Sequence, residues 1–150
     1  MDDFHAVGIN LQKQRIIRIS LGMFAVGLMF FSGTIYLSKR EIRRNVERLE
    51  DIQAITTALH EYAAAHDGAY PVGLDARVRQ IGSATAGCEM NTAQCSIGGT
   101  NDCIHLAPAL SPYLKKMPYD PGSGSSERTH YAVRSEWGGR FLVIACDYSE

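Results

Sequence analysis

The sequence predicts an α+β fold, in which one long N-terminal helix packs on a small antiparallel β-sheet. Three observations predict it. Residues 19–37 carry no charged side chain, apolar residues then recur at helical spacing as far as Tyr62, and two β-rich segments joined by a glycine-containing turn lie near the C-terminus. A lone hairpin is only marginally stable in water, so the helix is expected to cover the sheet.

The uncharged segment predicts a single transmembrane helix over residues 16–38. Its 19 uncharged residues, Ile19 to Leu37, cross a hydrocarbon core of about 30 Å at about 1.5 Å per residue. A core helix of this length does not suit so small a chain, and a cleaved signal peptide has a shorter apolar region followed by small residues. Gly22, Gly27 and Gly33 are expected to allow close packing between neighbouring membrane helices.

The flanking charges leave the orientation of this segment open. Three cationic residues precede it and five follow it, which by the positive-inside count places the C-terminal domain in the cytoplasm (Lys13, Arg15, Arg18; Lys39, Arg40, Arg43, Arg44, Arg48). The rule is weak for long translocated domains, and four cysteines in a small domain favour an oxidising compartment. We therefore expect residues 1–15 to be a cytoplasmic tail and residues 39–150 a periplasmic domain of a single-pass inner-membrane protein.

A helical pattern continues over residues 39–66. Seven apolar residues recur at spacings of three and four, which predicts an amphipathic helix whose apolar stripe packs on the sheet. Asp67-Gly68 and Pro71 end the pattern, with Gly68 as the C-terminal cap. A dimeric coiled coil is the alternative use of the stripe. Its members are Ile42, Val46, Leu49, Ile52, Ile55, Leu59 and Tyr62.

Residues 67–128 are predicted to be a cysteine-containing loop region, because glycine and proline interrupt every run. Residues 75–81 are expected to form one helical turn, and residues 104–116 a short helix or pair of turns. Residues 129–147 then form a hairpin, with strands over 129–134 and 140–146 and with Tyr131 and Val133 on one face. Trp137, at the hairpin tip, is either an exposed contact residue or one that folds back onto the sheet.

The four cysteines allow three disulfide pairings. We expect Cys88–Cys95, which closes a small loop, and Cys103–Cys146, which ties the loop region to the last strand. The second of these contributes about 3–4 kcal/mol in the chain-entropy model. A metal site formed by Cys88, Cys95, Cys103 and His105 is the alternative, although spacings of seven and eight differ from the close cysteine pairs of structural zinc.

Several local sequences resemble the type IV pilin superfamily, and in particular the major pseudopilins of type II secretion. Residues 54–62, followed by Asp67-Gly68-Ala69-Tyr70-Pro71, resemble the family's helix end, and residues 110–121 resemble its later segment, which ends in Asp-Pro. The resemblance covers roughly residues 45–147 and implies a pilin-like fold. The N-terminus differs from the family pattern, because polar residues and no glutamate follow Gly8, so no prepilin-peptidase site is recognisable.

The resemblance also implies a calcium site. Major pseudopilins often bind calcium in the loop that corresponds to the glycine-rich segment around Asp120, Ser123, Ser125 and Glu127. Asp120 and Glu127 are the candidate ligands, with Asp102 a further candidate from elsewhere in the chain. An ordinary turn is the alternative, because calcium prefers six to eight oxygen ligands. No other cofactor is expected.

No catalytic constellation is recognisable, so an enzyme is not predicted. A net charge of −1 without a basic block gives no indication of nucleic-acid binding. The resemblance to the pilin superfamily therefore implies a pilin-like subunit of an envelope filament or secretion apparatus, held in the lipid bilayer and associating with itself or with other pilin-like subunits. A membrane-anchored binding module that does not assemble is the alternative, and a small metalloprotein is a third.

Overall fold

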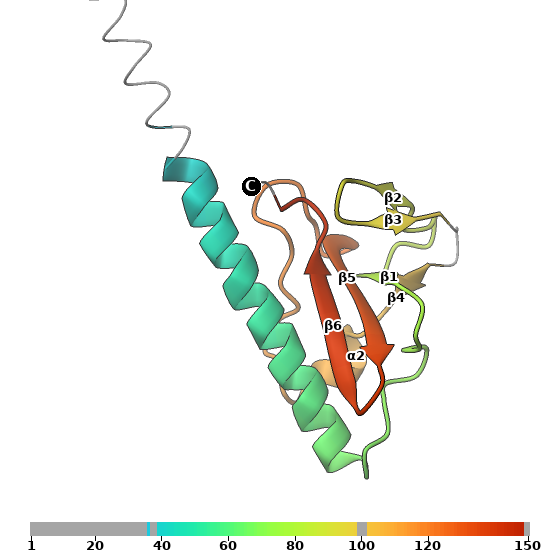
Figure 1. Cartoon of the computed structure of the whole chain (residues 1–150). Coiled ribbons are helices and arrows are strands. Elements are labelled where there is room, and N and C mark those ends of the chain that lie inside the picture. The colour runs from blue at the N-terminus through green and yellow to red at the C-terminus, as the bar shows by residue number, and fades with distance from the viewer. Residues whose placement is uncertain (1–35, 37–38, 99–101, 149–150) are drawn as a thin grey trace, which may run out of the picture. The chain divides into compact units, whose positions relative to one another are not determined.

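The computed structural model describes Tyr36, residues 39–98 and residues 102–148 (Figure 1). The chain divides into two compact units, Met1–Ile42 and Arg43–Glu150, and the fold given below is that of the second. Apart from Tyr36, the predicted tail and membrane segment lie outside the described residues, as do Gly22, Gly27 and Gly33. Within the described part of the chain, no helix is both long and apolar enough to cross a bilayer.

Residues 39–65 form one helix, and a second, short helix, α2, covers Ala107–Leu110. A four-stranded sheet has the order β4-β1-β5-β6, in which only the β1–β4 pair is parallel. Strands β2 and β3 form a separate antiparallel pair. The predicted α+β class is therefore confirmed. The strands are β1 (Arg79–Gly82), β2 (Met90–Asn91), β3 (Ser96–Ile97), β4 (Cys103–Ile104), β5 (Arg128–Glu136) and β6 (Arg140–Ala145).

The long helix ends in a left-handed turn close to the predicted cap. The Gly68 N–H donates to the Ala63 carbonyl at 2.8 Å, as in a Schellman motif. The left-handed conformation begins at Asp67, with φ of 54°, and continues at Gly68, with φ of 82°. The cap thus starts one residue before the predicted glycine, which aspartate tolerates because its short polar side chain can bond locally.

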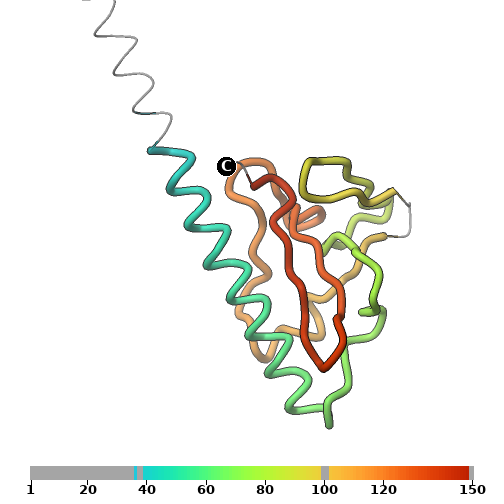
Figure 2. The backbone as a smooth tube through the Cα atoms, viewed as in Figure 1, coloured from blue at the N-terminus to red at the C-terminus, as the bar shows by residue number. Residues whose placement is uncertain are grey.

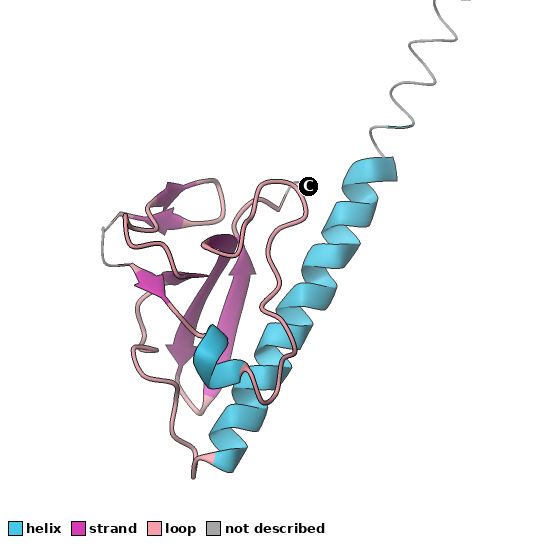
Figure 3. Cartoon of the chain, turned by 180° about the vertical axis from the view of Figure 1, so that it is seen from behind, coloured by secondary structure: helices cyan, strands magenta, loops and turns pink. Residues whose placement is uncertain are grey.

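One face of the sheet packs against the long helix. Ile55 and Leu59 of the helix are fully buried in the same cluster as Ile81, Tyr131 and Val133 of the sheet. The expectation that Tyr131 and Val133 share a face is confirmed. Helix α2 and the loop that follows it run alongside the long helix, as Figure 3 shows from behind.

The cysteine-containing segment covers the opposite face. Side chains alternate along a strand, so Ala132 points away from the helix, where it is buried with Cys95, Ile97 and Cys146. Figure 2 shows residues 84–98 on the side of the hairpin away from the helix. The centre of β5 is therefore buried on both faces.

One prediction about the loop region was wrong, because residues 79–82 belong to β1 instead of a helical turn. The short helix or pair of turns expected over residues 104–116 is present as α2, which is followed by a turn at residues 111–113. Short strands such as β1 and β4 form because they pair with neighbouring strands, and not because of the hydrophobic pattern of their own residues. At Gly82, for example, an added Cβ would lie 2.2 Å from the Glu127 carbonyl oxygen, so the approach of β5 requires glycine there.

Candidate functional site

The apolar stripe of the long helix divides into a buried part and an exposed part. Ile55 and Leu59 are 0% exposed, whereas Val46 and Leu49 are 49% and 57% exposed. Ile42, in the first unit, is exposed as well. We name Val46 and Leu49 the outer stripe.

The prediction that the whole stripe packs on the sheet was therefore wrong, and the spacing explains why. Each residue turns an α-helix by about 100°, so a spacing of three falls about 60° short of a full turn. The two consecutive spacings of three between Leu49 and Ile55 rotate the stripe by about 120° around the helix. The outer stripe consequently points away from the core.

A groove lies beside the same helix, with a volume of about 400 Å³. Its apolar wall is formed by Met117, Pro118, Tyr119 and Pro121, and Tyr119 is 39% exposed. Glu47 and Asp51 of the helix form an acidic edge, and Lys116 lies over the Tyr119 ring with its Nζ 5.2 Å from the ring centre. We name these seven residues the Tyr119 groove.

A buried ion pair fixes the loop of residues 118–127, which includes part of this groove. Arg48 Nε and Nη2 donate to the two carboxylate oxygens of Asp120 at 2.6 and 3.2 Å, and the side chains are 3% and 0% exposed. Asp120 also accepts from the N–H groups of Gly122 and Ser123, at 2.7 and 3.1 Å. A Cβ on Gly124 would lie 2.5 Å from the Asp120 nitrogen, so the turn requires glycine there.

One feature of the sequence indicates that Arg48 has a buried partner. Arg48 precedes Ile55 by seven residues, so it lies on the buried side of the helix, where a charge requires a partner.

The pKa values of Asp120, which belongs to this pair, and of Asp51 are shifted in opposite directions. Burial raises the pKa of Asp120, but the hydrogen bonds from Arg48, Gly122 and Ser123 outweigh it, and the net pKa lies below the ordinary value. Burial raises the pKa of Asp51 by more than the bond from the Tyr131 hydroxyl, at 2.7 Å, lowers it. Burial, with Asp51 alongside, also raises the pKa of Tyr131.

The two candidate calcium ligands lie in different surroundings. The Asp120 carboxylate is engaged by Arg48 and two backbone amides, whereas Glu127 is exposed and offers its backbone oxygen to Ser83 and Ala84. Among the described residues, no three His, Cys, Asp or Glu side chains gather in a group suited to a metal ion. The structure thus gives Asp120 a cationic partner from the protein itself.

The predicted disulfide pairing was wrong. The structure has Cys88–Cys103 and Cys95–Cys146, with no free cysteine. The β2–β3 hairpin explains the difference. Cys95 lies in the hairpin turn, where it is hydrogen-bonded to Thr92, whereas Cys88 precedes β2 at the open end of the hairpin, so the two cysteines are kept apart. All four sulfurs are in disulfides, so in this structure none of them is a thiolate that could bind a metal ion.

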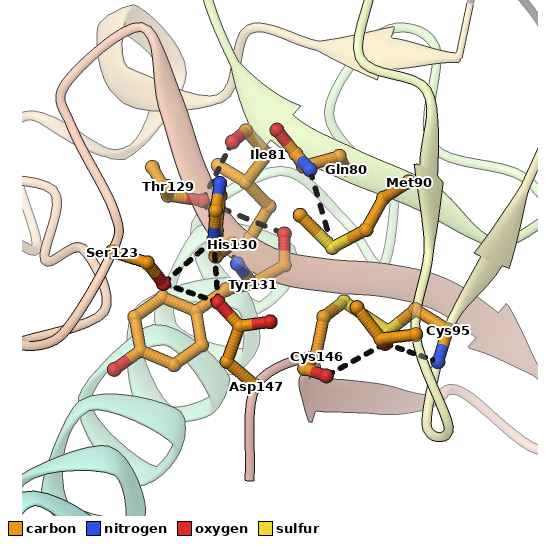
Figure 4. Close-up of a disulfide and its surroundings, with 11 residues drawn as sticks. Gln80, Ile81, Met90, Cys95, Ser123, Thr129, His130, Tyr131, Cys146 and Asp147 are labelled. Atoms are coloured by element: carbon orange, nitrogen blue, oxygen red, sulfur yellow. Dashed lines mark hydrogen bonds and ion pairs between the residues drawn. A yellow bond between two sulfur atoms is a disulfide. The ribbon is translucent and has the colours of Figure 1, made fainter.

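The Cys95–Cys146 disulfide (Figure 4) ties the β2–β3 hairpin to the end of β6. The Thr92 hydroxyl also donates to the Cys146 carbonyl at 2.7 Å.

A serine, a histidine and a carboxylate converge next to Cys146 (Figure 4). His130 Nδ1 lies 2.7 Å from Asp147 Oδ2 and 2.9 Å from Ser123 Oγ, and the Ser123 hydroxyl also donates to Asp147. In a catalytic triad the acid and the serine use different ring nitrogens. Here both use Nδ1, so the arrangement ties residues 118–127 to the C-terminal end of the sheet and is not that of an activated serine.

Trp137 is exposed at the tip of the β5–β6 hairpin and does not fold back onto the sheet, which was the other of the two expectations. Its side chain is 95% exposed, between Glu136 and two glycines with positive φ. It borders a shallow depression of about 600 Å³ with Arg134 and Arg140 on its walls.

No protein-family model matches the chain, and comparisons with curated proteins and with solved structures find no match.

Proposed function

We propose that the chain is a pilin-like structural subunit of an envelope filament or secretion apparatus, anchored in the inner membrane and assembling with other copies through its N-terminal helix. The exposure of Val46 and Leu49 on the side of the helix away from the core carries the proposal. Two large apolar side chains at helical spacing, on a helix that follows a predicted membrane segment, suit helix–helix packing.

The outer stripe alone is too small to hold two copies together. Burying a whole valine or leucine side chain contributes about 1.5–3 kcal/mol, and these two are already about half-buried. Association in solution costs at least about 4 kcal/mol of lost translational and rotational freedom. Anchoring in a shared membrane lowers the entropic cost of association, because it raises the effective concentration of the copies. Packing of the predicted membrane helices at Gly22, Gly27 and Gly33 adds further favourable free energy of association.

The test uses the full-length chain, produced with an affinity tag in a bacterial host that has a periplasm. Membranes are extracted in mild detergent, and the mass of the protein is measured by light scattering after size exclusion. We expect multimers for the natural chain and monomers for the Val46→Glu/Leu49→Glu variant. Val72→Glu, at an apolar residue that is 97% exposed in another loop, is the matched control and should remain multimeric.

A natural chain that extracts as a monomer, and that is absent from filaments in electron micrographs of sheared cells, would contradict the proposal. Intact disulfides in each variant show that the domain has folded.

Trp137 favours the anchored binding module as a second candidate function. An aromatic side chain so exposed, beside two arginines, has the composition of a contact surface. Trp137 is the only tryptophan of the chain, so fluorescence reports on it alone. A binding module predicts emission typical of a water-exposed indole in the extracted protein. Emission already shifted to short wavelength in multimers would instead place Trp137 in the contact between copies.

A further inference from the structure

We infer that the outer stripe of one copy packs into the Tyr119 groove of the next copy. This inference rests on the proposed self-association and names the two surfaces that meet. One is the helix side that carries Val46 and Leu49, and the other is the groove of about 400 Å³ that borders a different side of the same helix, at Glu47 and Asp51.

The two surfaces lie on different sides of the helix. At about 100° per residue, Glu47, on the groove edge, lies about 100° from Val46 and about 160° from Leu49 around the helix axis. A contact between two different surfaces is heterologous, so each copy that is added leaves one stripe and one groove unoccupied. Such a contact repeats along a row of copies, whereas a two-fold contact between identical surfaces closes at a dimer.

The groove suits two aliphatic side chains. Its wall is made of Met117, Tyr119 and two prolines, of which methionine adapts to irregular shapes and proline offers no N–H that would be left unpaired. Its volume lies within the range of about 300–1,000 Å³ that is usual for pockets that bury a ligand.

Each of the two surfaces carries charges of both signs, so each can offer a partner to the other. Arg43, whose side chain is 75% exposed, and the exposed Glu50 lie one helical turn before and after Val46, while Glu47, Asp51 and Lys116 line the groove. Within one copy, Arg43 lies 3.7 Å from Glu47 in an exposed pair. Exposed pairs of this kind are worth at most about 1 kcal/mol, so Arg43 can exchange this partner for the acidic edge of a neighbour at little cost.

The first test is disulfide cross-linking between two full-length chains with different tags, produced together in the same membrane. One carries Leu49→Cys and the other carries Tyr119→Cys. We expect a cross-linked species that contains both tags, and a ladder of multimers when both substitutions are in one chain. Leu49→Cys combined with Val72→Cys is the control, and it should give no such species.

The second test leaves the cysteines unchanged and reverses charges in different chains. Arg43→Glu and Glu47→Arg should each reduce the multimer fraction when produced alone. Two chains that carry one substitution each, produced together, should form mixed multimers, because the opposite charges then meet only between copies and not within one copy. This result does not depend on the native disulfide pairing.

Two outcomes overturn the inference and are distinguishable. Cross-links between two Leu49→Cys chains without the mixed species would show a two-fold contact, which overturns the stripe-to-groove contact and leaves self-association intact. Absence of every cross-link, with a natural chain that extracts as a monomer, overturns both the inference and the proposed function.

Discussion

The two faces of the β5–β6 hairpin are closed by different means. On the helix side, 13 apolar residues are buried in one cluster among the described residues, and one buried ion pair, Arg48–Asp120, joins the helix to the loop. On the other side, the corresponding cluster has four buried residues, two of which are the half-cystines Cys95 and Cys146.

The difference shows how a small domain closes a second face. The segment of residues 84–98 contains two strands of two residues each, which bury too little apolar surface to be held by packing alone. Disulfides replace that packing by restricting the unfolded chain. Closed loops with sequence separations of 15 and 51 give about 3 and 4 kcal/mol in the chain-entropy model.

The largest expected effect is on the helix side. Asp120→Asn keeps the shape of the side chain and removes the buried carboxylate charge that pairs with Arg48, so we expect the free energy of unfolding to fall by about 3–5 kcal/mol. Glu127→Gln makes the same chemical change at an exposed residue of the same loop and should alter stability by less than about 0.5 kcal/mol. Urea unfolding of both variants measures the difference. Equal midpoints would show that the ion pair does not hold the loop.

The next effect is on the disulfide side. Cys95→Ala/Cys146→Ala should lower stability by about 4 kcal/mol and Cys88→Ala/Cys103→Ala by about 3 kcal/mol. Non-reducing peptide mapping of the natural chain should give fragments linked as Cys88–Cys103 and Cys95–Cys146. A Cys88–Cys95 fragment would contradict the structure. Faster hydrogen exchange confined to residues 84–98 in the first variant would show that this cover opens while the helix side stays closed.

The elements on the helix side were predictable from the sequence, whereas the short strands were not. The long helix and the hairpin were predictable because their signals are local: apolar spacing of three and four, a glycine stop, and β-formers around Gly138-Gly139. Strands β1 and β4 have four and two residues, and β1 lies between two other strands, so no periodicity distinguishes them from loop.

The long-range pairs were not predictable for a different reason. Cysteine spacing cannot specify connectivity, and here the β2–β3 hairpin separates the two cysteines that are nearest in sequence. Arg48 and Asp120 are 72 residues apart, so only the position of Arg48 on the buried side of the helix indicated a buried partner. The division of the apolar stripe, in contrast, follows from its spacing alone and was available in the sequence.

A smaller effect is expected on the pH dependence of stability. Asp120 has a lowered pKa in the folded chain, so it stabilises the fold above the ordinary aspartate pKa of about 3.9, and this stability is lost as the pH falls through the lower folded pKa. Asp51 has a raised pKa, so its contribution has the opposite sign: it is present below about 3.9 and is lost as the pH rises through the folded pKa.

The stabilities of two variants should therefore converge on that of the natural chain from opposite sides as the pH falls. Asp120→Asn is less stable than the natural chain at neutral pH, and Asp51→Asn is more stable. Both differences should shrink on acidification, because the natural carboxyls become protonated. Thermal unfolding between pH 7 and pH 3 measures this. Stability differences that stay constant with pH would contradict the assignment.

The smallest effect tests whether the disulfide side also contains an unfavourable element. Gln80 is 0% exposed on this face, where its Nε2 lies 3.6 Å from the Met90 sulfur and its Oε1 has no hydrogen-bond partner among the described residues. A buried unsatisfied polar atom costs about 1–3 kcal/mol, so Gln80→Leu should stabilise the domain by about 1 kcal/mol. Gln94→Leu, at an exposed position of the β2–β3 turn, makes the same change and should be neutral.

Urea unfolding of the two leucine variants separates the possibilities. A gain confined to Gln80→Leu would mean that the disulfides offset the cost of a polar group left unsatisfied beneath residues 84–98. A loss of about 1 kcal/mol or more would mean instead that Gln80 Oε1 accepts a bond from a bound water, and that this face is held by a polar contact in addition to its two disulfides.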